Sequence, residues 1–130
     1  MGVLDHVGIT VSDLARSLDF YSAALAPLGV SEQMRVPASL TGHGDVVGYG
    51  AAGKPEFWLS AGERTKPHVH VALVAENRAA VDAFYAAALA AGGTDNGGPG
   101  VRPHYHPNYY GAFVLDPDGH NIEAVCHRSE

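Results

Sequence analysis

The sequence has little cysteine and little positive charge, and both scarcities exclude classes of protein. The single cysteine cannot form a disulfide within the chain, so nothing in the composition requires an oxidising compartment. Lysine and arginine number 8 against 14 aspartates and glutamates, which gives a formal charge of −6. Because phosphate contacts dominate affinity for nucleic acid, we expect no nucleic-acid partner and look instead for a small ligand.

Long hydrophobic runs are also missing. The stretch 1–6 has neither a basic flank nor an apolar run, which argues against secretion and membrane insertion. We therefore expect a cytoplasmic protein with no membrane partner. The 130 residues are enough for one domain with a stable core.

The chain shows the same strand and helix pattern twice. The first copy predicts a strand over 4–11, a helix from 14 to 25, and strands over 30–36, 45–49 and 56–60. After Pro67 the pattern restarts with a strand over 68–75 and a helix capped by Asn77, then a weak strand with a loop over 93–107 and strands over 109–115 and 120–125. Shifting the chain by 64 residues gives five identities over 16 positions without gaps, beginning with His6 on His70.

This repeat predicts an α+β fold. We expect one domain over 1–130 built from two βαβββ modules in tandem, the first about 1–62 and the second about 67–127. Strands without an intervening helix pair as antiparallel meanders, so the modules should form a curved, mostly antiparallel sheet. The helices then cover its convex face and leave a concave cavity for a ligand.

Three side chains point to chemistry in that cavity. The turn 116–119 leads into a strand whose apolar run holds one acid, Glu123, and a buried carboxylate needs a partner. His6 and His70 take equivalent places on the two first strands and face away from the helices. Two imidazoles and a carboxylate can hold a metal ion and leave coordination sites open. The alternative is a pair of interior histidines in a fold that has lost its metal, with Glu123 paired to Arg35 or Arg102.

With this repeat and these three residues, the chain resembles the vicinal oxygen chelate superfamily. That superfamily includes glyoxalase I, extradiol dioxygenases, fosfomycin-resistance transferases and metal-free bleomycin-binding proteins. The resemblance covers nearly the whole chain and is carried by the following segments: Leu4 to Ile9, Phe20-Tyr21, His70 to Leu73, Phe84-Tyr85 and Leu115 to Glu123. It implies that His6, His70 and Glu123 bind a divalent metal ion, Fe, Mn, Ni, Co or Zn. It also implies a homodimer, in some members with exchanged modules, and the residue usage fits a bacterial genome.

The chain departs from the glyoxalase I pattern at the fourth ligand. That ligand should lie in the strand 56–60, where the apolar pattern places Trp58 and counting from Gly53 places Phe57. Neither binds a metal, which argues against glyoxalase I activity. Glu56 lies on the face of Trp58, so a different register would restore a carboxylate.

The sequence supports two hypotheses of function. The first is a metal-dependent enzyme, a lyase, isomerase, transferase or dioxygenase, that polarises a substrate with adjacent oxygens. The alternative is a non-catalytic antibiotic-resistance protein that sequesters an aromatic drug or natural product. The residues expected to contact the ligand are Trp58, Tyr105, Tyr110 and Asn121, and the candidates for a general base are Glu56, His68, His104 and His106. We place His43, His120 and His127 at the surface or in turns, and Cys126 in the core.

Overall fold

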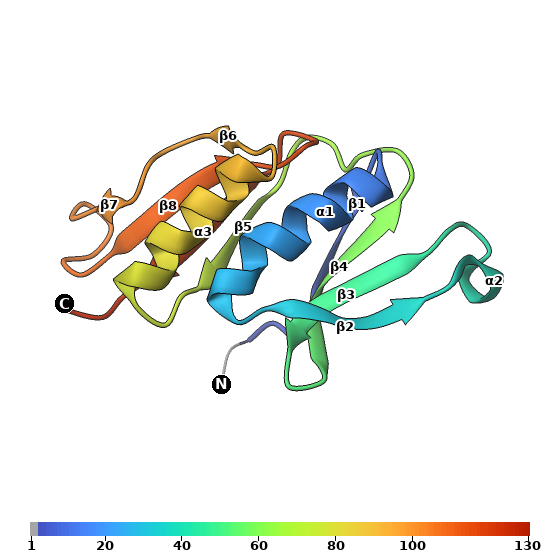
Figure 1. The fold of residues 1–130 in the computed structure, drawn as a ribbon, viewed down its shortest axis with the longest axis horizontal. Coiled ribbons are helices and arrows are strands. Elements are labelled where there is room, and N and C mark those ends of the chain that lie inside the picture. Colours follow the sequence, from blue (N-terminus) through green and yellow to red (C-terminus); the bar gives the residue numbers. More distant parts are fainter. Residues whose placement is uncertain (1–2) are drawn as a thin grey trace.

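The structure, a computed structural model, describes residues 3–130, so Met1 and Gly2 of the N-terminal stretch lie outside the described residues. Two sheets carry all the strands (Figure 1). The first has the order β1-β4-β3-β2, with β1 at Val7–Val11, β2 at Ser31–Val36, β3 at Val46–Ala51 and β4 at Lys54–Ala61. The second has the order β5-β9-β8-β6, with β5 at His70–Val74, β6 at Thr94–Asp95, β8 at Tyr110–Leu115 and β9 at Asn121–Cys126; β7, Gly100–Val101, also pairs with β8.

The two sheets repeat one topology. In each, the first strand pairs in parallel with the last, and the remaining pairs are antiparallel. This confirms the α+β class and the mostly antiparallel pairing. The strands form two sheets instead of one, and β1 and β5 each lie at an edge of their own sheet.

Two helices lie next to each other on the same side of the sheets (Figure 1). The helix α1, Leu14–Leu25, begins where the Asp13 side chain accepts a hydrogen bond from the Arg16 amide, and α3, Arg78–Ala90, begins where Asn77 does the same for Ala80. A 3₁₀ turn, η1 (Ala26–Leu28), extends α1 through Pro27. The short helix α2, Ala38–Thr41, was not expected from the sequence.

The apolar faces of the helices and sheets form one core. Phe20, Tyr21 and Phe84 are fully buried, as their helical spacing predicts, and so is Cys126. None of the helices within residues 3–130 has both the length and the apolar character needed to cross a membrane.

The turn before β9 is tied into this core. The Tyr21 hydroxyl donates to Asp116 Oδ2 at 2.5 Å, and Asp116 Oδ1 accepts from the amides of Asp118 and His120. The Gly119 amide bonds to the Asp116 carbonyl, as expected for a tight turn. His120, which we placed at the surface or in a turn, directly follows the turn but is not at the surface: the imidazole is fully buried, and its Nδ1 accepts from the Val69 amide at 3.1 Å.

Candidate functional site

Glu123 lies near the middle of β9 and is 1% exposed, so its carboxylate depends on partners within the protein. Oε1 lies 2.9 Å from Nε2 of His70, at the start of β5, and Oε2 accepts a hydrogen bond from the Tyr109 hydroxyl. The prediction that this acid has a partner is confirmed, and the partners are an imidazole and a phenol.

The alternative ion pairs of Glu123 with arginine are wrong. Arg35 forms a two-atom hydrogen bond with Glu32, and Arg102 donates to the carbonyls of Gly98 and Gly100. Burial and the neighbouring Glu123 carboxylate raise the pKa of Tyr109 to about 12, so the phenol stays protonated and acts as a donor at neutral pH.

His6 lies just before β1 and has its own acidic partner. Its Nδ1 lies 2.7 Å from Oδ2 of Asp5 and therefore carries the proton, which leaves Nε2 of neutral His6 free as a ligand atom. Hydrogen bonds from His6 and Lys54 lower the pKa of Asp5. A carboxylate behind an imidazole is the usual arrangement around a histidine that binds metal.

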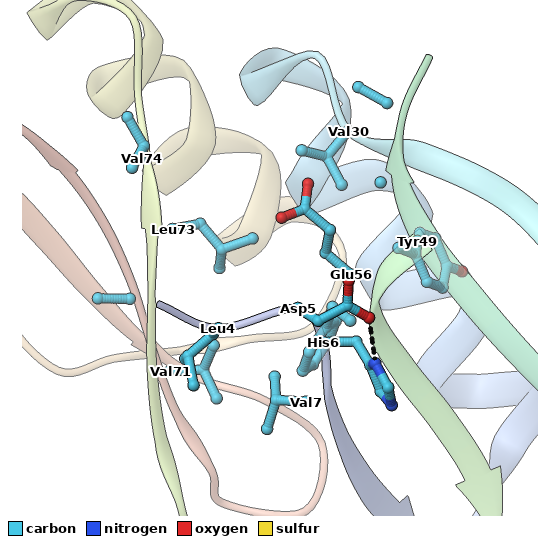
Figure 2. Close-up of a pocket in the computed structure, with 14 residues that line it drawn as sticks. Leu4, Asp5, His6, Val7, Val30, Tyr49, Glu56, Val71, Leu73 and Val74 are labelled. Carbon is cyan, nitrogen blue, oxygen red and sulfur yellow. Dashed lines mark hydrogen bonds and ion pairs between the residues drawn. The ribbon is translucent and has the colours of Figure 1, made fainter. Parts of the chain in front are cut away.

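A cavity of about 300 Å³ separates β1 from β5. Figure 2 shows the side chains of Leu4, Val7, Val71 and Leu73 in the space between the strands, with His6 bonded to Asp5. His6 and Glu56 line this cavity, but His70, Glu123 and Trp58 do not. The shared cavity expected from the sequence is therefore not formed by these residues within one chain.

The three proposed ligands do not converge within one chain. Among residues 3–130, no three histidine, cysteine, aspartate or glutamate side chains lie where they could hold one metal ion. Two of the three proposed ligands, His70 and Glu123, do lie side by side, and an imidazole nitrogen and a carboxylate oxygen are both suitable donors to a divalent metal ion. Their facing atoms are 2.9 Å apart, and two ligand atoms that lie about 2.1 Å from an octahedral ion, at about 90° to each other, are separated by about 3 Å.

The strand register identifies the residue equivalent to Glu123 in the first module. Glu123 is paired with Ala72, two residues after His70, and Trp58 is paired with Gly8, two residues after His6. Trp58 is therefore the equivalent of Glu123 in the first module, as the apolar pattern predicted, and Glu56 is not.

The other expected ligand contacts lie in different surroundings. Tyr110 does not face Glu123: its hydroxyl donates to Asp82 of α3 at 2.6 Å and Arg78 lies over its ring, so it packs on the helix side of β8. Tyr105 is exposed and packs against His104 and Tyr109. Asn121 is adjacent to His70 in the sheet, and its Oδ1 is buried without a hydrogen-bond partner among the described residues.

The candidates for a general base lie in three different places. Glu56 lines the cavity between β1 and β5, His68 is exposed before β5, and His104 and His106 belong to the loop before Tyr109. The Asn108 amide donates to His106 Nδ1, so the proton of neutral His106 sits on Nε2 and its basic nitrogen is already bonded. Within residues 3–130 no hydrogen bond engages the His104 ring, so its basic nitrogen is the open one of the two.

Sequence reasoning did not select Tyr109 and Asp5, the two residues that bond directly to the proposed ligands. The signal for Tyr109 was the alternation of β8. Residues 109, 111 and 113 share the face of Glu123, whereas Tyr110, Ala112 and Val114 face the core.

The chain belongs to the Glyoxalase/Bleomycin resistance protein/Dioxygenase superfamily, whose family profile matches residues 3–124. A solved glyoxalase/bleomycin resistance protein from Albidiferax ferrireducens is 29% identical, with 98% of this chain and 100% of that chain covered and a TM-score of 0.77. A superfamily member from Sphaerobacter thermophilus is 22% identical over 97% and 98%, with a TM-score of 0.63.

A mutant glyoxalase I from Zea mays is 23% identical, with 94% of this chain but only 46% of that longer chain covered and a TM-score of 0.71. No protein of curated function matches the chain. The comparisons confirm the superfamily and the fold expected from the sequence.

Proposed function

We propose that this protein is a metal-dependent enzyme of the glyoxalase/dioxygenase type, acting on a small substrate with adjacent oxygens. The observation that carries the proposal is the pair His70 and Glu123, an imidazole nitrogen 2.9 Å from a carboxylate oxygen that is almost fully buried. A divalent ion held there would act as a Lewis acid on the substrate. The cytoplasmic location expected from the sequence belongs to the same proposal.

The third ligand, His6, would come from a second copy of the chain. His6 and the pair of His70 and Glu123 belong to different modules, so a symmetric dimer would form two sites, each with one module from either chain. Two features support such a contact. The strands β1 and β5 lie at sheet edges, and Leu4 and Val74 beside them are 76% and 80% exposed.

Each residue then has a definite role. Asp5 holds His6 with its free nitrogen available, and Glu123 supplies Oε1 beside His70. In the loop, Tyr105 packs against Tyr109 and His104 packs against Tyr105, and His104 is the candidate to move a proton of the substrate.

Mixing two inactive variants tests both the ligands and the shared site. His6→Ala and Glu123→Ala should each lose bound metal as pure proteins. When they are unfolded together in equal amounts and refolded, half the dimers are mixed and each mixed dimer keeps one intact site. Metal analysis should then recover about a quarter of the wild-type content.

Three results would count against the proposal. Wild-type protein that binds no divalent ion under varied metal supply would remove the metal function. Mixing that restores no metal would place the site within one chain. Light scattering that shows a monomer at micromolar concentration would remove the dimer.

A second function is supported by Trp58. The indole lies over Gly48, where an added Cβ would be 3.0 Å from the ring, so it forms a flat aromatic surface in the first module. Such a surface suits a protein that sequesters an aromatic antibiotic or natural product. Thermal stabilisation by an aromatic ligand that persists in His6→Ala and Glu123→Ala, without turnover, would select this function over the enzyme.

A further inference from the structure

Tyr109 bonds directly to Glu123, but it is not one of the proposed ligands. We propose that Tyr109 is a positioning residue, whose hydroxyl holds Oε2 of Glu123 so that Oε1 remains beside His70. This inference rests on the proposed metal function and assigns a task to a residue that the three-ligand set leaves out.

The buried carboxylate offers two oxygens that need partners, and each has one. His70 lies at Oε1, and the Tyr109 hydroxyl donates to Oε2. The terminal torsion of a glutamate has a broad energy profile, so a carboxylate bonded at one oxygen alone can rotate. The second hydrogen bond fixes which oxygen faces the imidazole, and it prevents the carboxylate from offering both oxygens to one ion.

The surroundings hold the Tyr109 ring in place. The ring packs against Tyr105 and His127, with ring centres 5.1 Å away in both cases and interplanar angles of 61° and 87°. The Tyr109 amide donates to the His106 carbonyl at 3.0 Å, and its carbonyl accepts from the Arg102 amide at 2.7 Å. The hydroxyl therefore reaches Glu123 from a fixed ring and a fixed backbone.

Gly111 provides the space for this contact. A Cβ at that position would lie 3.2 Å from Oε2 of Glu123 and 3.2 Å from the edge of the Tyr109 ring. Any larger residue would therefore crowd both partners and require one of them to shift by a few tenths of an ångström. The local sequence supports the bond between Tyr109 and Glu123 in two ways. The glycine at 111 leaves room for it, and the rings of Tyr105 and His127 hold the Tyr109 ring in place.

The experiment compares Tyr109→Phe with Tyr85→Phe, which removes a hydroxyl on α3 that also donates to a carboxylate, that of Asp95 at 3.0 Å. Zinc affinity would be measured by calorimetry against a competing chelator, and bound metal would be counted. Tyr109→Phe should bind the same number of ions as wild type with about 10- to 100-fold lower affinity, as for other residues that orient metal ligands. Tyr85→Phe should stay within about twofold of wild type. The visible absorption bands of the cobalt-loaded protein should change in Tyr109→Phe only, because those bands report ligand geometry.

A second variant covers the case in which Tyr109→Phe does not fold. Gly111→Ala keeps both side chains but places a methyl group 3.2 Å from each of them, and this crowding should weaken zinc binding in the same way. Unchanged affinity and unchanged cobalt bands in the folded variants would show that Tyr109 only packs, and the metal function would stand. Loss of the bound ion itself in Tyr109→Phe would make Tyr109 a ligand instead of a positioning residue. Wild-type protein without zinc affinity would overturn the metal function and this inference together.

Discussion

The two modules share one fold but differ at the pair of residues where chemistry is expected. In the first module Trp58 lies opposite Gly48, and in the second Glu123 lies opposite Phe113. The aromatic side chain of the pair lies on the last strand, β4, in the first module and on the strand before the last, β8, in the second.

The histidines of the two modules differ in how deeply their acidic partners are buried. His6 bonds to Asp5, which is exposed, whereas His70 bonds to Glu123, which is buried. The second module thus contains an assembled imidazole and carboxylate pair, and the first contains one oriented imidazole and an aromatic surface. A duplicated fold can keep its strand register while each copy takes a different part in the site.

The hairpins before the last strands differ as well. In the first module β3 and β4 are joined by Ala52 and Gly53, both with positive φ, as in a tight two-residue turn. In the second module the turn starts at Asp116, which is buried and accepts hydrogen bonds from three donors. Local backbone conformation dominates the first turn, and side-chain bonds dominate the second.

The largest effect is expected from Asp116→Ala, which removes the side-chain bonds of the second turn. The Tyr21 hydroxyl and the amides of Asp118 and His120 would lose their acceptor, at a cost of about 3 to 5 kcal/mol in the free energy of unfolding. Tyr21→Phe removes one of these bonds and should cost about 1 to 2 kcal/mol. Urea unfolding measures both values, and equal losses in the two variants would show that the amides do not depend on the carboxylate.

The same bond predicts how stability depends on pH. Burial and the Asp116 carboxylate raise the pKa of Tyr21 well above its usual value of 10. The folded protein therefore binds this proton more tightly than the unfolded chain does. The contribution of this bound proton to the free energy of unfolding is complete below pH 10, and it is lost as the pH rises through 10 toward the pKa of Tyr21 in the folded protein. Between pH 9 and 11 the loss of stability should be smaller in Tyr21→Phe than in wild type, and parallel curves would contradict this.

A smaller effect is expected when the first module is made to resemble the second. Trp58→Glu places a carboxylate at the position equivalent to Glu123, and Gly48 leaves space opposite it. Under the proposed function this fourth ligand should strengthen metal binding at least about tenfold, a difference of about 1.4 kcal/mol. Trp58→Gln is the matched control, with the same shape but no charge. If both variants bind the ion equally well, the two positions are equivalent in the fold but not as ligand sites.

Much of the fold could be predicted from the sequence because its signals are local. Asp13 and Asn77 mark the helix starts, and the apolar spacing marks the buried faces of both helices. The repeat also fixed the equivalence of His6 and His70. The antiparallel pairing of the later strands followed from the absence of helices between them, but the parallel pairing of the first strand with the last did not.

The site was harder to predict because its geometry depends on contacts between distant segments. The choice between Tyr109 and Tyr110 depended on where β8 begins, since one residue reverses the face of a strand side chain. His120 follows a turn, which usually lies at the surface, but here Tyr21 draws the turn into the core. The relative placement of His6 and Glu123 depends on module packing, on which the sequence pattern carries no information.

The smallest effect is expected at the first turn, where the conformation of one residue is unfavourable. Ala52 has a φ of +53°, a region in which the Cβ of an L residue is crowded and which glycine adopts freely. Ala52→Gly should therefore raise the free energy of unfolding by about 0.5 to 1 kcal/mol, since the relief of this crowding exceeds the added entropy of the unfolded chain. Ala51→Gly, one residue earlier in β3, is the matched control and should lower stability by a similar amount, because glycine weakens a strand. Urea midpoints measured under one set of conditions distinguish the two. A loss of stability in both variants would mean that the strain at Ala52 is negligible, and the contrast between the two turns would then rest on Asp116 alone.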